Sequence, residues 1–324
     1  MKTINEILQL INSEIDKTAW TKEPRGLYEP IAYTLRLGGK RIRPAVALMA
    51  CNLFSEDVQP AIKPAIGIEI FHNFTLLHDD IMDKADLRRG QPTVHKKWDE
   101  NTAILSGDMM QIAAYQFIAE TKAEYLKQVL DIFSQTAGEV CEGQQYDMEF
   151  EKRETVSVAE YLDMIRLKTA VLLAASLKTG AVLGGAKAED AQALYDFGID
   201  IGMAFQLKDD LLDTYGDEKT FGKKIGGDIL CNKKTYLLTT ALEKADAVQR
   251  EKLQSCLQIP SGREEEKITF VTSVYDELNV KVACEDAMNS YYSSAMANLD
   301  NVQVDNDKKQ ELRILAKKLM FRED

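Results

Sequence analysis

The chain has 324 residues, of which 45% are hydrophobic, and its formal net charge at pH 7 is −12. That length is enough to bury a large core, in one domain or in two. The acidic balance disfavours nucleic acid as a partner, because neutralising a phosphate backbone requires a basic face. No apolar run approaches the roughly 18 residues that a membrane-spanning helix needs, so we expect no transmembrane segment.

Cysteine usage and the N-terminal segment both bear on the cellular compartment. Residues 1–17 are amphipathic and contain acidic side chains, so they lack the apolar centre of a signal peptide. The cysteines are odd in number, widely spaced and free of Cys-x-x-Cys pairs; they are Cys51, Cys141, Cys231, Cys256 and Cys284. We therefore expect reduced thiols in a cytoplasmic protein, and neither a disulfide framework nor a zinc site.

Proline placement and apolar spacing predict helices along nearly the whole chain. Residues 93–259 contain no proline, and a proline inside a helix costs about 3 kcal/mol, so long helices are permitted there. Ile66, Ile70, Phe74 and Leu77 illustrate the helical spacing of apolar residues, whereas the alternation typical of strands is nearly absent. In chain order, we predict helices over residues 3–18, 27–37, 42–54, 60–86, 100–121, 124–147, 158–183, 188–215, 234–246, 264–300 and 306–320.

No internal repeat, low-complexity tract or proline-rich linker divides the chain, so we predict a single all-α domain over residues 1–324. Segment 216–233 is polar and rich in glycine, and we expect it to form a functional loop. The acidic C-terminal third carries no comparable motif and is interpreted as scaffold.

Two of the predicted helices end in an Asp-Asp-x-x-Asp motif. The six carboxylates are Asp79, Asp80, Asp83, Asp209, Asp210 and Asp213. Residues four apart lie about 40° apart around a helix, so the first and last Asp of each motif share a face. Carboxylates without nearby Cys or His suit Mg²⁺, which usually also binds phosphate oxygens. Two identical motifs indicate metal binding beside a phosphorylated ligand, and disfavour the alternative of two solvated acidic faces.

Basic residues lie close to both motifs in the sequence. The segment 38–44 (GGKRIRP) precedes the first motif, and Arg88 and Arg89 follow it. Lys223, Lys224, Lys233 and Lys234 follow the second motif. Each group alone could be a solvated or helix-capping charge, but beside two acidic motifs they indicate a clamp for diphosphate. A zinc site at His72, His78 and His95 is disfavoured, because the first two lie on different faces of a helix and no Cys is near.

These motifs, in this order, resemble the trans-isoprenyl diphosphate synthases, or polyprenyl synthetases, which include farnesyl and geranylgeranyl diphosphate synthases. The resemblance covers roughly residues 35–240. It implies an all-α, isoprenoid synthase-type helical bundle with a deep central pocket, usually a homodimer. It also implies a prenyltransferase that joins isopentenyl diphosphate head to tail to an allylic diphosphate (dimethylallyl, geranyl or farnesyl), with Mg²⁺ in about three copies per active site.

The resemblance assigns roles to the acidic residues and to the diphosphate ligands. Asp79 and Asp83 would hold Mg²⁺ at the allylic diphosphate, with Asp80 supporting them. Asp209 would hold a further ion, with Asp210 and Asp213 nearby. The residues expected to bind isopentenyl diphosphate are Lys40, Arg43, His72 and Arg89, whereas Arg88 would contact the allylic diphosphate.

Further residues are expected around the leaving diphosphate and the developing carbocation. They are Lys168, Thr169, Gln206, Lys223 and Lys233, with Lys224 as an alternative to Lys223. Gln144 and Asp147 match a supporting position of the family pattern. No dedicated general base is evident, and the resemblance suggests the released diphosphate as the proton acceptor.

Product length is expected to depend on side chains one to two turns before Asp79. On a helical wheel with Asp79 at zero, Thr75 lies at about −40°, Phe71 at about −80° and Phe74 at about −140°. In the family, an aromatic residue five positions before the first Asp is associated with geranylgeranyl-type synthases, and Phe74 has that position. A second aromatic residue at Phe71 could shorten the product. We therefore predict a C20 or C15 product, with ordinary core packing as the alternative role of these rings.

Two other functions share a metal-bound helical pocket. A class I terpene cyclase or head-to-head squalene-type synthase would not need isopentenyl diphosphate, and Lys40, Arg43 and Arg89 favour the condensing enzyme. A non-catalytic subunit of a heteromeric prenyl synthase would be expected to lose part of an aspartate motif, whereas both motifs here are complete.

Overall fold

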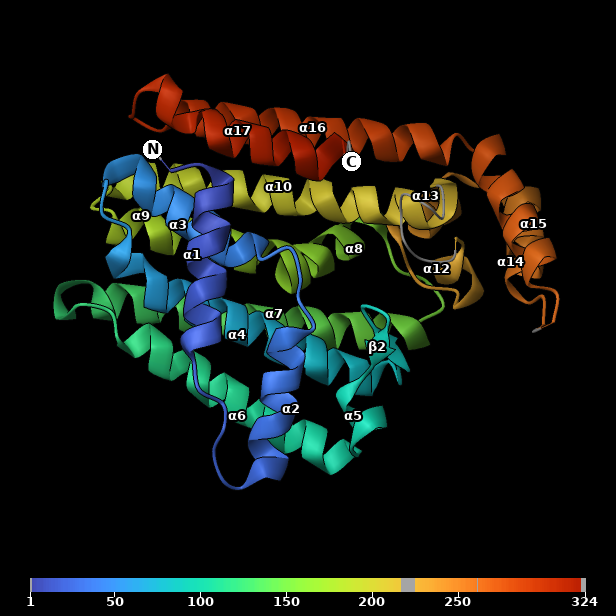
Figure 1. Ribbon diagram of the computed structural model, residues 1–324. Coiled ribbons are helices and arrows are strands. Elements are labelled where there is room, and N and C mark those ends of the chain that lie inside the picture. Colours follow the sequence, from blue (N-terminus) through green and yellow to red (C-terminus); the bar gives the residue numbers. More distant parts are fainter. Residues whose placement is uncertain (1, 217–224, 261, 322–324) are drawn as a thin grey trace. The chain divides into compact units, whose positions relative to one another are not determined.

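The computed structural model describes residues 2–216, 225–260 and 262–321 (Figure 1). Within these ranges the regular structure is helical apart from one short antiparallel hairpin, which confirms the predicted all-α class. None of the helices in these ranges combines the length and the apolar character needed to cross a bilayer.

The elements follow one another along the chain in the following order. They are α1 (Ile4–Lys17), α2 (Arg25–Arg36), α3 (Ile42–Phe54), α4 (Gln59–Met82), β1 (Leu87–Arg88), β2 (Gln91–Pro92), α5 (Val94–Lys97), α6 (Glu100–Ala119), α7 (Ala123–Lys152), α8 (Val158–Ile165), the π-helix η1 (Arg166–Ala170), α9 (Val171–Leu183), α10 (Ala188–Tyr215), α12 (Gly227–Leu230), α13 (Tyr236–Lys244), α14 (Ala247–Leu257), α15 (Glu264–Glu277), α16 (Val280–Asn301) and α17 (Asn306–Phe321).

Most predicted helices are confirmed, but the helix expected over residues 60–86 ends early, at Met82. Lys84 adopts the left-handed conformation, with φ of 53°. The backbone N–H of Lys84 then donates to the carbonyl of Ile81 (3.2 Å), and that of Ala85 donates to Asp80 (2.9 Å). This pattern satisfies the last carbonyls of a helix and usually has glycine at the left-handed position. Because lysine has that position here, no residue type signals the end of the helix.

Two further predictions about helices were incomplete. The helix expected over residues 264–300 is interrupted at Asn279, whose φ of 52° belongs to the left-handed region that Asn tolerates better than most residues. Helix α14 was not predicted, because its buried side chains are few: Leu253 and Cys256. Its start does carry a sequence signal, since Asp246 and Gln249 form a capping box.

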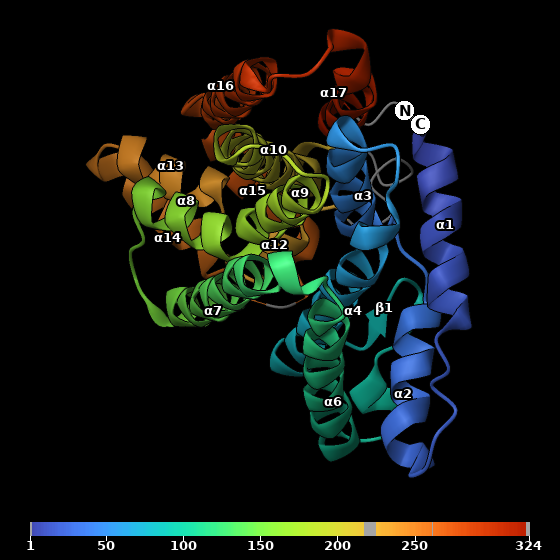
Figure 2. The same cartoon turned by 90° about the vertical axis from the view of Figure 1, so that its left-hand side faces the viewer.

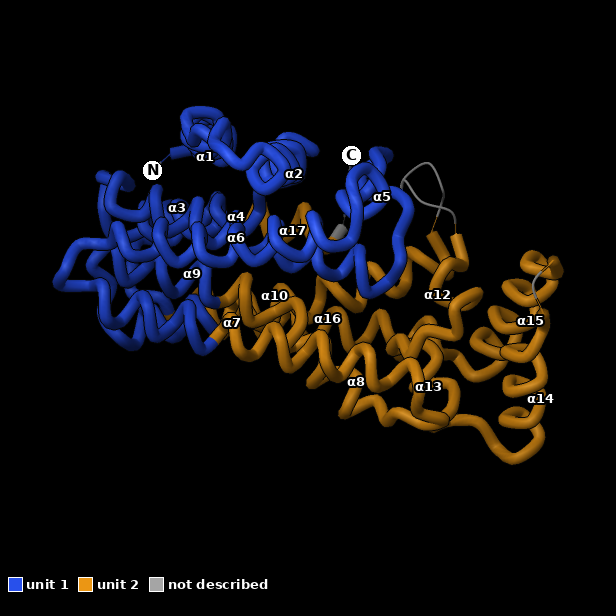
Figure 3. Tube along the Cα trace, turned by 90° about the horizontal axis from the view of Figure 1, so that it is seen from below, with its two compact units in different colours: residues 1–135, 175–195, 302–312 blue, residues 136–174, 196–301, 313–324 orange. Residues whose placement is uncertain are grey.

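The chain divides into two compact units, each with its own core (Figure 3). Unit 1 comprises residues 1–135, 175–195 and 302–312. Unit 2 comprises residues 136–174, 196–301 and 313–324. The first acidic motif belongs to unit 1 and the second to unit 2.

Helix α4 forms the centre of unit 1 and packs against α3 and α6 (Figures 1 and 2). Glycines allow α6 to lie unusually close to α4. A Cβ at Gly67 would be 2.9 Å from the carbonyl oxygen of Ala114, and a Cβ at Gly107 would be 2.2 Å from Nε2 of His78. This close contact fixes the C-terminal half of α4, which carries the first acidic motif.

The core of unit 2 surrounds the second half of α10. Met203, Leu207 and Leu211 of α10 are buried together with Leu237 of α13 and Cys284 of α16. Helix α13 in turn packs against α8, α15 and α16. Apolar residues at helical spacing thus anchor α10 on one face, and the second acidic motif lies at the end of this helix.

Candidate active site

The first acidic motif lies where α4 ends, and its three carboxylates differ in exposure. The side chain of Asp79 is 19% exposed and that of Asp80 is 6% exposed, whereas Asp83 is exposed at the helix C-cap. The backbone N–H of Asp83 donates to the carbonyl of Asp79 (2.9 Å), so these residues remain one helical turn apart. Asp79 and Asp83 therefore share one face, as the spacing predicted, whereas Asp80 is directed into the protein.

The hairpin after α4 presents two consecutive arginines. Leu87 pairs with Pro92 and Arg88 with Gln91, which leaves a two-residue turn. Arg89 and Gly90 form that turn with φ of 53° and 73°. Positive φ at both positions is the geometry that matches the natural twist of a hairpin. As a result, Arg88 is directed toward α4, and Arg89 lies at the tip of the turn.

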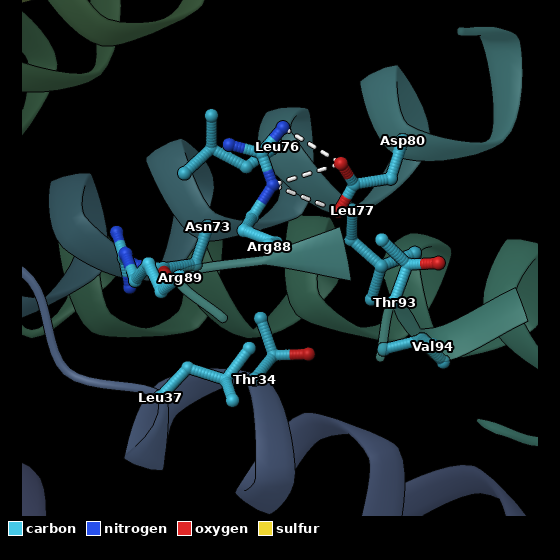
Figure 4. A pocket seen from close by; sticks show the side chains of 10 residues that line it. All are labelled: Thr34, Leu37, Asn73, Leu76, Leu77, Asp80, Arg88, Arg89, Thr93 and Val94. Atoms are coloured by element: carbon cyan, nitrogen blue, oxygen red, sulfur yellow. Dashed lines mark hydrogen bonds and ion pairs between the residues drawn. The ribbon is translucent and has the colours of Figure 1, made fainter. Parts of the chain in front are cut away.

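Arg88 makes a bidentate contact with Asp80 (Figure 4). Its Nε lies 2.9 Å and 2.8 Å from the two carboxylate oxygens of Asp80, and its Nη2 lies 3.8 Å from Oδ2 of Asp79. Burial raises the pKa of Asp80, and the bonds from Arg88 oppose that shift. Both oxygens of Asp80 are thus engaged by Arg88, and the carboxylate holds the guanidinium beside Asp79.

A small cavity of about 10 Å³, room for roughly one water molecule, lies beside this pair (Figure 4). Its lining residues come from α2, α4, the hairpin and the start of α5, and they are Thr34, Leu37, Asn73, Leu76, Leu77, Asp80, Arg88, Arg89, Thr93 and Val94. Drug-sized ligand pockets usually begin near 300 Å³, so this cavity is too small for a prenyl chain.

Residues expected at the isopentenyl diphosphate lie close together in unit 1. Nη1 of Arg43 lies 3.2 Å from Nε2 of His72. Burial, followed by Arg43 and its neighbouring arginines, lowers the pKa of His72 well below its ordinary value. The imidazole is therefore neutral near pH 7, and its Nε2 accepts a hydrogen bond from Arg43.

The glycine loop before α3 completes this basic group. Nη1 of Arg89 donates to the carbonyl of Gly38. Gly39 has a φ of 136°, which residues other than glycine rarely adopt, and a Cβ there would be 2.8 Å from Nη2 of Arg89. The exposed Lys40 follows immediately. The structure thus brings the loop with Lys40 together with Arg89, as it brings Arg43 together with His72.

The side chains expected to set product length form part of an aromatic cluster in unit 1. Phe71 is fully buried and Phe74 is 8% exposed. The ring of Phe71 lies 5.4 Å from that of Phe74 and 5.2 Å from that of Phe133 on α7. The Thr75 hydroxyl donates to the carbonyl of His72 (2.8 Å). Aromatic rings thus fill the space next to α4 over the two turns that precede Asp79.

In unit 2, the middle carboxylate of the second motif is also engaged by the protein. Asp210 accepts hydrogen bonds from the Tyr161 hydroxyl (2.5 Å), the Tyr236 N–H (3.0 Å) and Nε2 of Gln206 (3.3 Å). Burial raises the pKa of Asp210 to about 7, although these donors oppose the shift. Asp210 therefore ties α8 and the start of α13 to α10.

Asp213 organises the start of α12. Its Oδ2 accepts from the N–H of Asp228 (2.9 Å), and its carbonyl accepts from the N–H of Gly226 (2.6 Å). Asp209, one turn earlier, is half-buried. The N–H of Lys233, just after α12, donates to the carbonyl of Asp228 (2.9 Å). Lys223 and Lys224 lie outside the residues that the structure describes.

Lys168 and Thr169 lie in η1, a π-helical turn within the helix predicted over residues 158–183. Nζ of Lys168 lies 2.6 Å from Oδ2 of Asp147, and the Thr169 hydroxyl lies 3.4 Å from Oε1 of Gln206. A Cβ at Gly143 would lie 2.3 Å from the backbone N of Lys168, so only glycine allows α7 to approach η1 this closely. Gln144, the next residue, is half-buried. The structure therefore gathers Lys168, Asp147, Thr169 and Gln206 in unit 2.

Sequence reasoning missed several buried partners of these residues, including Tyr161, Gly143 and the pair Arg41 and Glu69. Only Glu69 had a visible signal, because it is an acid between two isoleucines on an apolar stretch of α4. The others depend on contacts between residues far apart in the chain.

Among the residues described, no three His, Cys, Asp or Glu side chains gather closely enough to hold a metal ion. The pair Asp79 and Asp83 nevertheless offers two hard oxygen donors on one face. Mg²⁺ is commonly bound by one or two carboxylates, with water and phosphate as its other ligands, so this donor set fits the ion.

The helical architecture is that of the all-α isoprenoid synthase fold. One crystal structure of a geranylgeranyl pyrophosphate synthase matches this chain with a TM-score of 0.94 and 43% identity, covering 99% of each chain. A geranylgeranyl pyrophosphate synthase from Corynebacterium glutamicum, complexed with isoprenyl diphosphate and magnesium, matches with a TM-score of 0.82 and 28% identity, covering 98% of this chain and 97% of that one.

Sequence comparison identifies the family. The profile of polyprenyl synthetases matches residues 24–277. The geranylgeranyl diphosphate synthase of Methanosarcina mazei is 42% identical over 236 residues, which are 72% of this chain and 73% of that protein. The geranylfarnesyl diphosphate synthase of Natronomonas pharaonis is 38% identical over 265 residues, 76% of this chain and 77% of that protein. The chain belongs to the polyprenyl synthetase family, and within it the chain is a short-chain prenyltransferase.

Proposed function

We propose that this protein condenses isopentenyl diphosphate with an allylic diphosphate to form geranylgeranyl diphosphate, and that it requires Mg²⁺. The observation that supports this product is the buried pair Phe71 and Phe74, one to two turns before Asp79. The name of the 42% identical relative from Methanosarcina mazei points to the same C20 product. Farnesyl diphosphate is the alternative that a second aromatic ring favours.

We assign the metal ions to Asp79 and Asp83 of the first motif and to Asp209 of the second, with Asp213 nearby. Asp79 and Asp83 share one face of α4, and Asp209 and Asp213 are spaced in the same way on α10. Asp80 and Asp210 are buried, where Arg88 and Tyr161 bind them, and we assign them supporting roles. Bound Mg²⁺, in about three copies, would neutralise charge that develops on the departing diphosphate.

The chain's own cations would stabilise the same leaving group. Arg88, Lys168 and Lys233 are assigned to the allylic diphosphate, together with Lys223. Losing one preorganised donor of this kind typically lowers the rate by about 10²–10³-fold. We assign the Thr169 hydroxyl and the Gln206 amide, whose oxygens lie 3.4 Å apart, to the developing allylic carbocation, which their oxygen dipoles would stabilise.

The second substrate is assigned to the basic group around the glycine loop. Lys40, Arg43 and Arg89 would bind the diphosphate of isopentenyl diphosphate, and His72 would contribute its remaining N–H, because Nε2 already accepts from Arg43. The released diphosphate would accept the proton that ends the condensation. Water must be excluded until then, since it would trap the carbocation as an alcohol.

We further propose that the protein is a homodimer of single-domain chains, with α6 at the interface. Ile104, Leu105 and Ile112 of α6 are 42%, 60% and 54% exposed. They lie on the outward face of α6, beside the exposed Asp108, and several large apolar side chains exposed on one helix are typical of a surface that a partner covers.

The test is product analysis with the purified chain. Isopentenyl diphosphate would be incubated with each allylic starter and Mg²⁺, and the products measured by mass spectrometry. We expect a C20 diphosphate and no turnover in EDTA. A hydrocarbon formed without isopentenyl diphosphate would indicate a terpene cyclase. Turnover that requires a second protein would indicate a subunit of a heteromeric synthase.

A further inference from the structure

A buried ion pair lies behind the basic group of unit 1. Arg41 is 7% exposed and Glu69 is 2% exposed, and Nη1 of Arg41 lies 2.7 Å from Oε1 of Glu69. Nη2 of Arg41 donates to the carbonyl of Leu35 (2.5 Å). The Asn73 amide donates to the same Oε1 of Glu69 (3.1 Å). The pair therefore connects the end of α2, the start of α3 and the middle of α4.

A buried ion pair of this kind adds little to the free energy of unfolding, so we look for its role in the positions of the residues that it connects. The free energy lost when two charges leave water often exceeds the free energy gained from their attraction. Proteins with apolar replacements of similar size are commonly as stable. Arg41 also has its backbone in the left-handed region, with φ of 49° and ψ of 35°, which a non-glycine residue rarely adopts. The fold thus accepts a charged side chain and a strained backbone at one position, directly before α3.

The strained position holds both ends of the substrate-binding loop. Lys40 is the residue before Arg41, and Arg43 lies two residues after it. On the other side, Arg89 donates to the carbonyl of Gly38. The loop 38–40 is therefore anchored on one side by the buried guanidinium of Arg41 and on the other side by the hairpin.

Glu69 also acts electrostatically on the neighbouring arginines. Burial lowers the pKa of Arg43 and of Arg89, and Glu69 opposes the shift in both. Arg41 adds to the lowering at Arg89. One buried carboxylate thus offsets the mutual repulsion of three guanidiniums that must stay close together before an anion arrives.

We propose that Arg41 and Glu69 are positioning residues for the isopentenyl diphosphate site. They hold Lys40, Arg43 and Arg89 in a preorganised cluster, so that binding does not have to assemble it. The inference rests on the proposed function, which assigns those three side chains to this substrate.

The test replaces the pair without leaving a lone buried charge, in the variant Arg41→Met/Glu69→Leu. We expect a KM for isopentenyl diphosphate about 10-fold higher or more, because small displacements of binding groups have large effects. The KM for the allylic diphosphate and the melting temperature should stay close to those of the wild type. A matched control is Asp86→Asn/Lys96→Gln, which removes an exposed ion pair (2.9 Å) of the same unit and should change neither KM.

The outcomes separate this inference from the proposed function. If the wild type does not consume isopentenyl diphosphate, the proposed function is wrong. If the wild type does, but the folded double variant has an unchanged KM for it, the pair is merely structural. Should the double variant not fold, Arg41→Lys decides, because one ammonium cannot replace a guanidinium that reaches both Leu35 and Glu69. We expect its KM for isopentenyl diphosphate to rise several-fold, and an unchanged KM would refute the inference.

Discussion

Asp80 and Asp210 occupy the same position of their motifs, and both are engaged by protein groups. Arg88 binds both oxygens of Asp80, and Tyr161 donates to Asp210 at 2.5 Å. The helical spacing predicted which aspartates share a face. The partners of the middle ones could not be predicted, because they lie on a hairpin that follows an unsignalled helix stop and on a separate helix.

Phe74 and Phe71 carry the prediction about chain length. Phe71→Ala/Phe74→Ala should lengthen the product beyond C20, because it removes two rings from the two turns before Asp79. Each truncation of a buried Phe typically costs about 3–5 kcal/mol, so Phe74→Ala alone should be assayed in parallel. The measurement is mass spectrometry of the products, with circular dichroism to confirm folding. An unchanged product from folded variants would refute this assignment of the pocket floor.

The cysteines give a prediction about thiol chemistry. Burial raises the pKa of Cys51 to about 12. Because the thiolate is the nucleophile, Cys51 should resist alkylation at pH 8, whereas the exposed Cys231 should react. The raised pKa also implies that the contribution of Cys51 to stability is present below about pH 9 and is lost as pH rises through 12. Peptide mapping after brief iodoacetamide treatment would measure how fast each cysteine is alkylated, and rapid labelling of Cys51 in the folded protein would contradict the prediction.

At the scale of elements, long amphipathic helices were predictable and their interruptions were not. The bounds of α3 and α10 agree with prediction, because apolar periodicity specifies them. The π-helix η1 has no sequence signature, since it depends on how α7 packs against it. In the sequence, its neighbour Gly143 resembles any other helical glycine. Its importance is apparent only from the close approach of the Lys168 backbone in the structure.

Gly143→Ala should therefore destabilise the protein by about 1–3 kcal/mol, since its Cβ would meet backbone atoms that cannot rotate away. Activity should fall as well, because the displaced atoms belong to Lys168. Gly138→Ala on the same helix is the matched control: its Cβ would meet nothing within 4 Å, and alanine should add up to about 1 kcal/mol of stability. Thermal unfolding of both variants would compare them, and equal melting temperatures would show that the contact at Gly143 is unimportant.

At the scale of the whole molecule, composition excluded classes of protein but did not specify the assembly. The net charge of −12 and the absence of long apolar runs disfavoured nucleic acid and a membrane span. The division into two compact units was not foreseen, because no linker marks it: the boundary at residue 135 falls within α7. The outward apolar side chains of α6 are likewise visible only once the buried face of that helix is known.

Ile112→Asp tests the proposed dimer. Ile112 is 54% exposed, so the substitution should leave the folded chain intact. Placing a charge in an apolar interface should shift the protein to monomers, measured by light scattering after size-exclusion chromatography. Val248→Asp, at a residue 75% exposed on α14, serves as control and should keep the wild-type mass. A dimer that survives Ile112→Asp would place the interface elsewhere.

At the turn of the hairpin, stability and catalytic activity favour different residues. Arg89 has a φ of 53°, which lies in the left-handed region that Asn adopts far more readily than arginine does. Selection for stability alone would favour Asn there, so an arginine suggests that its charge matters more than an unstrained turn. Arg89→Asn should therefore melt at a higher temperature and yet be a poorer catalyst. Heat-tolerant variants selected without an activity screen should accumulate changes at this position.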